Sequence, residues 1–202
     1  MEPTSSMGLG ILAFGSLVEE PGAELEAAVR QLLEVETPFL VEFARSSQTR
    51  DGAPTLVPVT EGGAHIPASV LVLDESVTVA DARAMLYRRE TGRPNDASAA
   101  SRVGWIAELS DFEGICTCLY TALEANIPPP LTPEKLAELA LRSAVALSGA
   151  KRRDGISYLQ QQKRRGVETP LMGAYEQAVL ERTGTRDLEE AWERVRLRSA
   201  SA

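Results

Sequence analysis

A short apolar run bounded by glycines, at residues 10–15, most constrains what this chain can fold into. Its sequence, Gly-Ile-Leu-Ala-Phe-Gly, predicts a buried strand. A glycine directly after a buried strand is typical of a sharp turn or a close backbone approach. Apolar residues then recur at helical spacing, so we expect a helix over 23–36. Free amides in the intervening loop can bind a carboxylate, a phosphate or a developing oxyanion, although the same pattern also fits a plain structural turn.

The rest of the chain has the composition of an ordinary globular protein. Its 202 residues are 44% hydrophobic and 25% charged, which favours one domain spanning 1–202. Strand patterns at about 10–14, 39–43, 66–73, 103–108 and 114–122 place a β-rich portion in residues 8–122. Helical patterns fill residues 131–197. We therefore predict an α+β fold in which the helices form a layer over the sheet.

Charge and composition exclude several function classes. The net charge of −8 argues against binding to nucleic acid or to an anionic membrane. No apolar stretch reaches the length of a membrane span, and the run at 8–18 lacks the basic leader of a signal peptide, so a cytoplasmic location is expected. Cys116 and Cys118, two residues apart in a predicted strand, are interpreted as reduced core thiols. With His65 they make no convincing zinc site, so no metal is expected.

A carboxylate stands in an unfavourable place on the helix predicted after the third strand pattern. That helix begins at Thr78, with Asp81 at its third position, and stops before Gly92. Glu90 lies at its C-terminal end, where the helix dipole disfavours negative charge by roughly 0.3–1 kcal/mol. The arginines at 88, 89 and 93 suit that end, so Glu90 requires another explanation.

The glycine loop and Glu90 together fit a general base beside an anion-binding cradle. Ser16 is not expected to act as a nucleophile, because the chain has a single histidine and lacks the Gly-x-Ser-x-Gly elbow. The pattern Gly10-x-x-x-x-Gly15 lacks the Lys-Ser/Thr of a phosphate-binding loop. Serine-hydrolase and kinase interpretations are therefore disfavoured.

The motif Phe14-Gly15-Ser16-Leu17 resembles the Tyr-Gly-Ser/Thr-Leu signature of the γ-glutamylcyclotransferase family. The segment Leu-Tyr-Arg-Arg-Glu at 86–90, followed by Thr-Gly, resembles the motif that carries the family's catalytic Glu. The loop at 45–54, which contains Arg50, and the segments Gly-Ile-Ser-Tyr-Leu at 155–159 and Gly-Val at 166–167 are similar to the ChaC-type branch. One departure is Phe14 where the family has Tyr, which removes a hydroxyl and bears on substrate choice.

This resemblance implies a small mixed β-barrel with surrounding helices, in which the strand patterns share one closed or nearly closed sheet. It also implies cyclisation of a γ-glutamyl compound such as glutathione to 5-oxoproline, a lyase-type reaction without a cofactor. Glu90 would be the general acid/base, and the residues of 14–17 and Arg50 would bind the small-molecule substrate. A carboxylate that acts as a base near neutral pH needs a buried environment. The Gly15 loop and Glu90 are accordingly expected to open into one pocket.

Several alternatives stay open at this stage. A non-catalytic member of the same fold would bind a small ligand or a protein, and another enzyme of the family would remove a γ-glutamyl group from a biosynthetic intermediate. Glu90 itself fits a solvated surface residue on sequence pattern alone. Arg88 and Arg89 fit charges that complement the helix dipole better than ligands. Tyr87 and Trp105 fit packing residues better than site residues.

Overall fold

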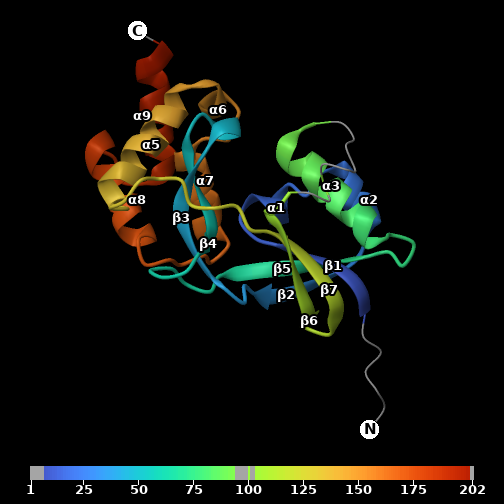
Figure 1. The fold of residues 1–202 in the computed structure, drawn as a ribbon. Coiled ribbons are helices and arrows are strands. Elements are labelled where there is room, and N and C mark those ends of the chain that lie inside the picture. Colours follow the sequence, from blue (N-terminus) through green and yellow to red (C-terminus); the bar gives the residue numbers. More distant parts are fainter. Residues whose placement is uncertain (1–6, 94–99, 101–102, 201–202) are drawn as a thin grey trace. The chain divides into compact units, whose positions relative to one another are not determined.

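The computed structural model describes residues 7–93, 100 and 103–200 (Figure 1). Its contacts divide the chain into two compact units, each built from two separate stretches of sequence. The first unit comprises the residues up to Thr37 together with Pro67–Leu123. The second unit comprises Pro38–Ile66 together with the residues from Glu124 onward. The portions expected at 8–122 and 131–197 do not follow this division, because residues 38–66 belong with the C-terminal helices.

The first unit contains a mixed sheet and several helices. Its strands and helices are β1 (Met7–Ala13), α1 (Ser16–Glu19), α2 (Ala23–Ala28), β2 (Val29–Glu36), β5 (Pro67–Leu73), α3 (Val79–Thr91), β6 (Ile106–Phe112) and β7 (Ile115–Thr121). Within the described residues, five strands pair in the order β2-β5-β1-β7-β6. β1 is parallel to β7 and antiparallel to β5, and the two outer pairs are antiparallel. The strand patterns at 103–108 and 114–122 correspond to β6 and β7, which pair antiparallel.

β1 occupies the middle of this sheet because its side chains are apolar on both faces. Ile11 packs in a core cluster with Leu71 and with Leu25 and Leu86 of the helices, which cover that face of the sheet (Figure 1). Leu12, which points to the other face, is also fully buried. The glycine that precedes the run has a packing role, because a Cβ at position 10 would lie 2.7 Å from Cγ1 of Val70.

The helix predicted over 23–36 is wrong in its second half. α2 ends at Ala28, and Val29–Glu36 forms the edge strand β2. The apolar residues in this stretch fit a helical period, but the burial from Leu33 to Glu36 alternates with period two. Pairing with β5, from Gln31 opposite Val72 to Glu36 opposite Pro67, decides between the two periods. Tertiary pairing thus overrides the local pattern.

The closed barrel is also wrong. The five-stranded sheet ends at β2 on one side and at β6 on the other, with no pairing between these edges in the described residues. The strand predicted at 39–43 does not join this sheet. It forms β3 (Leu40–Ser47) and pairs with β4 (Ala53–Val59) in a separate two-stranded ladder. Because β3 finds its partner locally, the larger sheet has no strand with which to close.

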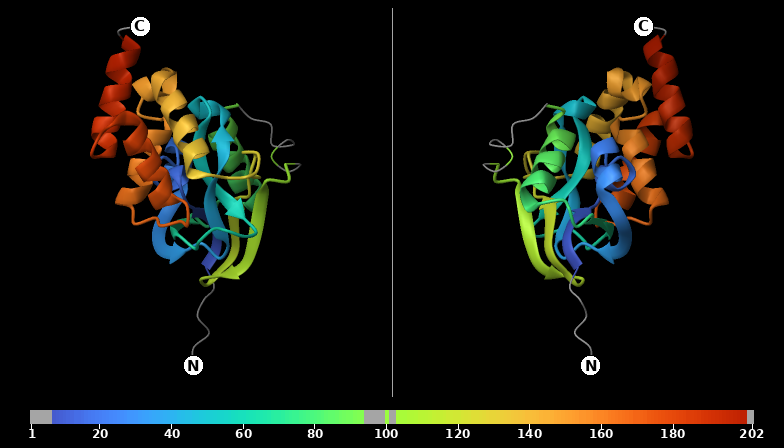
Figure 2. Two further views of the ribbon diagram at one scale, coloured as in Figure 1. Left: turned by 90° about the vertical axis from the view of Figure 1, so that its left-hand side faces the viewer. Right: turned by 90° about the vertical axis from the view of Figure 1, so that its right-hand side faces the viewer.

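The second unit combines this ladder with the C-terminal helices. Its helices are the 3-10 turn η1 (Gln48–Arg50), α5 (Pro133–Val145), α6 (Leu147–Ala150), α7 (Gly155–Arg164), α8 (Met172–Thr183) and α9 (Leu188–Ala200). The two turned views show the helices from α5 to α9, coloured from yellow-orange to red, gathered together (Figure 2). Thr132 caps α5, its hydroxyl accepting from the Lys135 amide, and Asp187 accepts from the Glu190 amide at the start of α9.

Two buried carboxylates hold the second unit together. Glu42 on β3 is 1% exposed and accepts hydrogen bonds from the Phe43 amide at 2.8 Å, the Thr169 hydroxyl at 2.6 Å and the Leu171 amide at 3.0 Å. Asp154 caps α7 and also accepts from the Trp192 indole at 3.1 Å. Each charge is compensated by several donors, which is the condition for burying a carboxylate.

The two cysteines differ in environment, although both lie on β7. Cys118 is fully buried, as expected, whereas Cys116 is exposed, so the expectation of two core thiols is wrong for Cys116. Cys116 is the second residue of β7. Burial raises the pKa of the Cys118 thiol to about 12.

We predict that iodoacetamide near pH 8 modifies Cys116 in the folded protein and leaves Cys118 intact. The thiolate is the reactive form, and at this pH a thiol with a pKa of about 12 is almost entirely protonated as well as inaccessible. Intact-mass spectrometry should show one adduct on the native protein and two after denaturation. Rapid native labelling of Cys118 would contradict its placement in the core.

A second prediction concerns Gly155, the first residue of α7. A Cβ at this position would lie 2.7 Å from Cα of Ala140 and 2.9 Å from Cδ of Pro54. Gly155→Ala should therefore destabilise the protein by about 1–3 kcal/mol in denaturant unfolding. Gly173→Ala is the control, because no atom lies within 4 Å of its Cβ position in α8. The control should be as stable as the parent or more so; equal effects from both changes would contradict this packing.

Candidate functional site

The loop after β1 makes the sharp turn that the glycine motif predicts. Gly15 has φ 59° and ψ −131°, a conformation that favours glycine. Phe14 before it is buried, and Ser16 after it begins the single turn α1. The chain therefore reverses beside the end of the central strand, which holds the backbone of residues 14–17 against the core.

The amides of this loop are only partly available for a ligand. The Leu17 amide already donates to the Phe14 carbonyl at 3.3 Å, so its expected role in binding an anion is not supported. The amides of Gly15 and Ser16 have no acceptor within residues 7–93, 100 and 103–200. Two of the three proposed donors thus remain.

Glu90 lies in the last turn of α3, as the sequence predicts. The helix begins with the complete capping box of Thr78 and Asp81 and ends at Gly92, which adopts a left-handed conformation. The Glu90 side chain is 17% exposed, which makes it partly buried rather than a freely solvated surface group. Its Oε1 accepts a hydrogen bond, whereas its Oε2 has no donor in the described part of the chain.

Arg89 joins Glu90 to the loop after β1. Its Nη1 donates to Oε1 of Glu90 at 2.6 Å, and its Nη2 donates to Oγ of Ser16 at 3.2 Å. Its Nε donates to the carbonyl of Glu20 at 3.0 Å, beyond the end of α1. One guanidinium, with its side chain 16% exposed, therefore connects the two sequence motifs. The fork geometry of arginine suits this threefold contact.

This contact also changes how the position of Glu90 is explained. The helix dipole disfavours a carboxylate here, but Arg89 supplies an opposite charge at hydrogen-bonding distance. Glu90 is thus stabilised without reference to catalysis. From the sequence, Arg89 is expected to be a charge that complements the helix dipole, and its connecting role is not apparent. The available signal was its position directly before Glu90 in the second motif.

The neighbouring residues have structural contacts. Arg88 pairs with Glu24 of α2 through Nε and Nη2, and this hydrogen bonding raises the pKa of the arginine. Tyr87 is 8% exposed and stacks on Trp105 with the ring centroids 6.0 Å apart. Arg88 therefore links α2 to α3. The packing interpretation of Tyr87 and Trp105 agrees with the stack.

Arg50 belongs to the second unit, whereas the loop and Glu90 belong to the first. It is the last residue of η1, is 6% exposed, and has its guanidinium carbon 5.1 Å from the ring centroid of Tyr158. Tyr158, from the 155–159 motif, packs edge-on against Phe43. This geometry is that of a cation–π contact on an aromatic core. A role for Arg50 in binding substrate remains a prediction.

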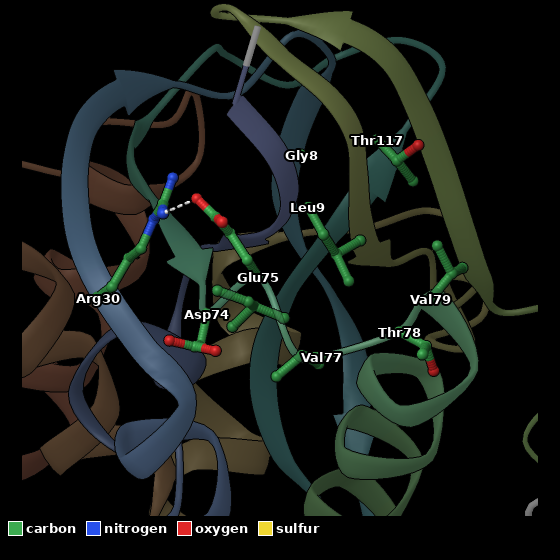
Figure 3. Close-up of a pocket in the computed structure, with 10 residues that line it drawn as sticks. Gly8, Leu9, Arg30, Asp74, Glu75, Val77, Thr78, Val79 and Thr117 are labelled. Carbon is green, nitrogen blue, oxygen red and sulfur yellow. Dashed lines mark hydrogen bonds and ion pairs between the residues drawn. The ribbon is translucent and has the colours of Figure 1, made fainter.

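The structure contains a cavity of about 310 Å³ in the first unit, away from these residues (Figure 3). Leu9, Leu73, Val77 and Val79 form its apolar surface, and the Arg30–Glu75 ion pair lies at its border. It lies at the N-terminal ends of β1 and α3. Gly15, by contrast, follows the C-terminal end of β1, and Glu90 lies in the last turn of α3. This cavity is therefore not the pocket expected to join Gly15 to Glu90.

The described residues contain no group of three or more His, Cys, Asp or Glu side chains arranged to hold a metal ion. None of their helices combines the length and apolar character needed to cross a membrane.

Comparisons with protein-family models, curated proteins and solved structures found no match for this chain.

We predict that Arg89 and Ser16 are energetically coupled through the observed hydrogen bond. Lysine has a single ammonium group and cannot reproduce the three contacts of Arg89, so Arg89→Lys should cost about 1–2 kcal/mol of unfolding free energy. Ser16→Ala should cost less. In a double-mutant cycle followed by denaturant unfolding, the coupling should be about 0.5–1.5 kcal/mol. Additive effects would show that the contact contributes nothing to stability.

Proposed function

We propose that this chain is a γ-glutamylcyclotransferase that releases 5-oxoproline from a small γ-glutamyl compound. The observation that supports this most is the bridge through Arg89, which brings Glu90 and the Gly15–Ser16 loop together from distant parts of the sequence. These are two of the segments that carry the resemblance. Their order, spacing and mutual contact favour a common site in the first unit.

The proposed reaction needs little from the protein beyond orientation and proton transfer. The substrate's α-amine attacks its own γ-carbonyl, forming the lactam C–N bond, and the original amide C–N bond then breaks. Both reacting groups belong to one molecule, so fixing a single rotamer supplies most of the proximity. The attacking amine loses a proton and the departing amine gains one.

Glu90 is the candidate for both proton transfers. Its Oε2 has no donor among the described residues and would accept the proton of the attacking amine. Arg89 would hold Oε1 and fix the direction of the carboxylate. The Gly15 and Ser16 amides would bind the substrate α-carboxylate or the tetrahedral oxyanion, with Phe14 beside them. Glutathione, other γ-glutamyl compounds and a biosynthetic intermediate are the alternative substrates, and they differ in the group that is released. The proposed place of action is the cytoplasm.

A non-catalytic binding protein is the second candidate function. Two observations favour it. The ion pair with Arg89 gives Glu90 a structural role, and the open sheet departs from the closed barrel that the resemblance implies. In this alternative the loop amides would bind the carboxylate of a small ligand without turnover.

The test is to incubate the protein with glutathione and several γ-glutamyl amines and to measure 5-oxoproline by mass spectrometry. Glu90→Gln should lower turnover by at least about 10²-fold, because glutamine cannot accept the proton. Substrate affinity should survive, since the loop amides are unchanged. Glu24→Gln is the matched control, because Glu24 also pairs with an arginine of α3. It should retain the parent rate.

The outcomes separate the two functions. A folded Glu90→Gln protein that is nearly as active as the parent would remove Glu90 from the mechanism. If the parent releases no 5-oxoproline but calorimetry detects binding of a γ-glutamyl compound, the binding protein is correct. Absence of both turnover and binding would overturn both candidates.

A further inference from the structure

α7 ends in a complete Schellman motif, at the start of the connection 165–171 that leads to α8 (Figure 1). The Gly166 amide donates to the Lys163 carbonyl at 3.0 Å, and the Val167 amide donates to the Gln162 carbonyl at 3.1 Å. Gly166 has the left-handed conformation of the motif, with φ 75°. This motif ordinarily places an apolar contact between the two residues that here are Gln162 and Val167. Val167 is apolar and 2% exposed, but its counterpart is a glutamine.

The side chain of Gln162 is buried without compensation. The residue is fully buried, and neither its Oε1 nor its Nε2 makes a hydrogen bond with any described residue. Both atoms are also sealed from solvent. A buried amide of this kind opposes the closed structure, because it has lost its hydrogen bonds to water and gained none from the protein. The end of α7 therefore carries a local conflict at a position where an apolar residue would be stable.

The far end of the connection is held by contacts of a different kind. The Thr169 hydroxyl and the Leu171 amide donate to the two carboxylate oxygens of Glu42 on β3, at 2.6 Å and 3.0 Å. Hydrogen bonds to a carboxylate are among the strong ones in proteins. The exposed residues of the connection are Gly166, Glu168 and Pro170. Glu42 thus holds the segment closed, few buried side chains assist it, and Gln162 favours opening.

We propose that residues 165–171 form a strap that opens locally while the rest of the second unit stays folded. Opening brings the Gln162 amide into water, where its hydrogen bonds are satisfied, and it releases two donors from Glu42. Segments with few buried apolar contacts are those that open in this way. The open form presents a carboxylate and a primary amide that the closed form hides. This inference does not depend on the proposed enzymatic function.

Native-state hydrogen exchange of the full chain, followed residue by residue by NMR, tests the strap. The Val167 and Leu171 amides lose their acceptors when the strap opens, whereas the amide of Val179, a fully buried residue in the middle of α8, reports global unfolding. After correction for intrinsic rates, the two strap amides should exchange at least about tenfold faster than that of Val179. Their exchange should also depend less on denaturant, because a local opening exposes little surface.

Substitutions at the two ends of the strap test its cause. Gln162→Met removes both polar atoms and keeps a good helix former, so exchange of the strap amides should slow about tenfold or more. Gln161→Met is the matched control, because Gln161 is only half-buried, and it should leave the exchange unchanged. Thr169→Val removes a hydroxyl that donates to Glu42 and should speed the exchange about tenfold.

The outcomes are distinct. Slower exchange in Gln162→Met alone, with faster exchange in Thr169→Val, supports the strap. If the strap amides of the parent exchange as slowly as that of Val179, the connection moves only with global unfolding and the proposal is overturned. Equal exchange in the Gln162→Met and Gln161→Met proteins would overturn it too, because the buried amide would then contribute nothing. The parent and Thr169→Val keep the test decisive even if Gln162→Met fails to fold.

Discussion

The first unit depends on the burial of one strand, β1, from both sides. Its apolar residues on one face pack against the helices, and those on the other face are equally buried. A strand of this kind can only occupy the middle of a sheet, so β5 and β7 flank it and β2 and β6 take the edges. The turn at Gly15 follows this strand directly, and the bridge through Arg89 reaches the loop that begins there.

The sequence predicts features that depend on local chemistry. The start of α3 at Thr78 with Asp81 in its first turn, the stop at Gly92 and the sharp turn at Gly15 all form as expected. Prediction from the sequence fails where an apolar pattern fits both a helix and a strand, or where the partner of a residue is distant in the sequence. Residues 29–36 fit a helical pattern, but they pair with β5 as a strand. Glu42 fits the polar face of a strand, but it is buried with donors from Thr169 and Leu171.

The candidate site shows the same limit to what the sequence predicts. Gly15 and Glu90 could be found from their positions after a strand and at a helix end. For Arg89 the sequence offers only its position directly before Glu90, because its role arises from contact with Ser16, 73 residues earlier. The same contact gives the Glu90 carboxylate a counter-ion, so its position at the helix end is explained without catalysis. The case for catalysis therefore depends on Oε2, which has no donor among the described residues, and on the adjacent amides rather than on the helix dipole.

The interleaving of the two units affects how the chain folds as it is synthesised. All segments of the first unit have been synthesised once Leu123 has been added. At that point residues 38–66 still lack the helices of their own unit, which begin after Glu124. Glu42 in that waiting segment needs Thr169 and Leu171 before its charge can be buried. The β3–β4 hairpin is therefore inserted between the two stretches of the first unit and lacks its own partners during synthesis. The rate of translation determines how long this hairpin can form non-native contacts.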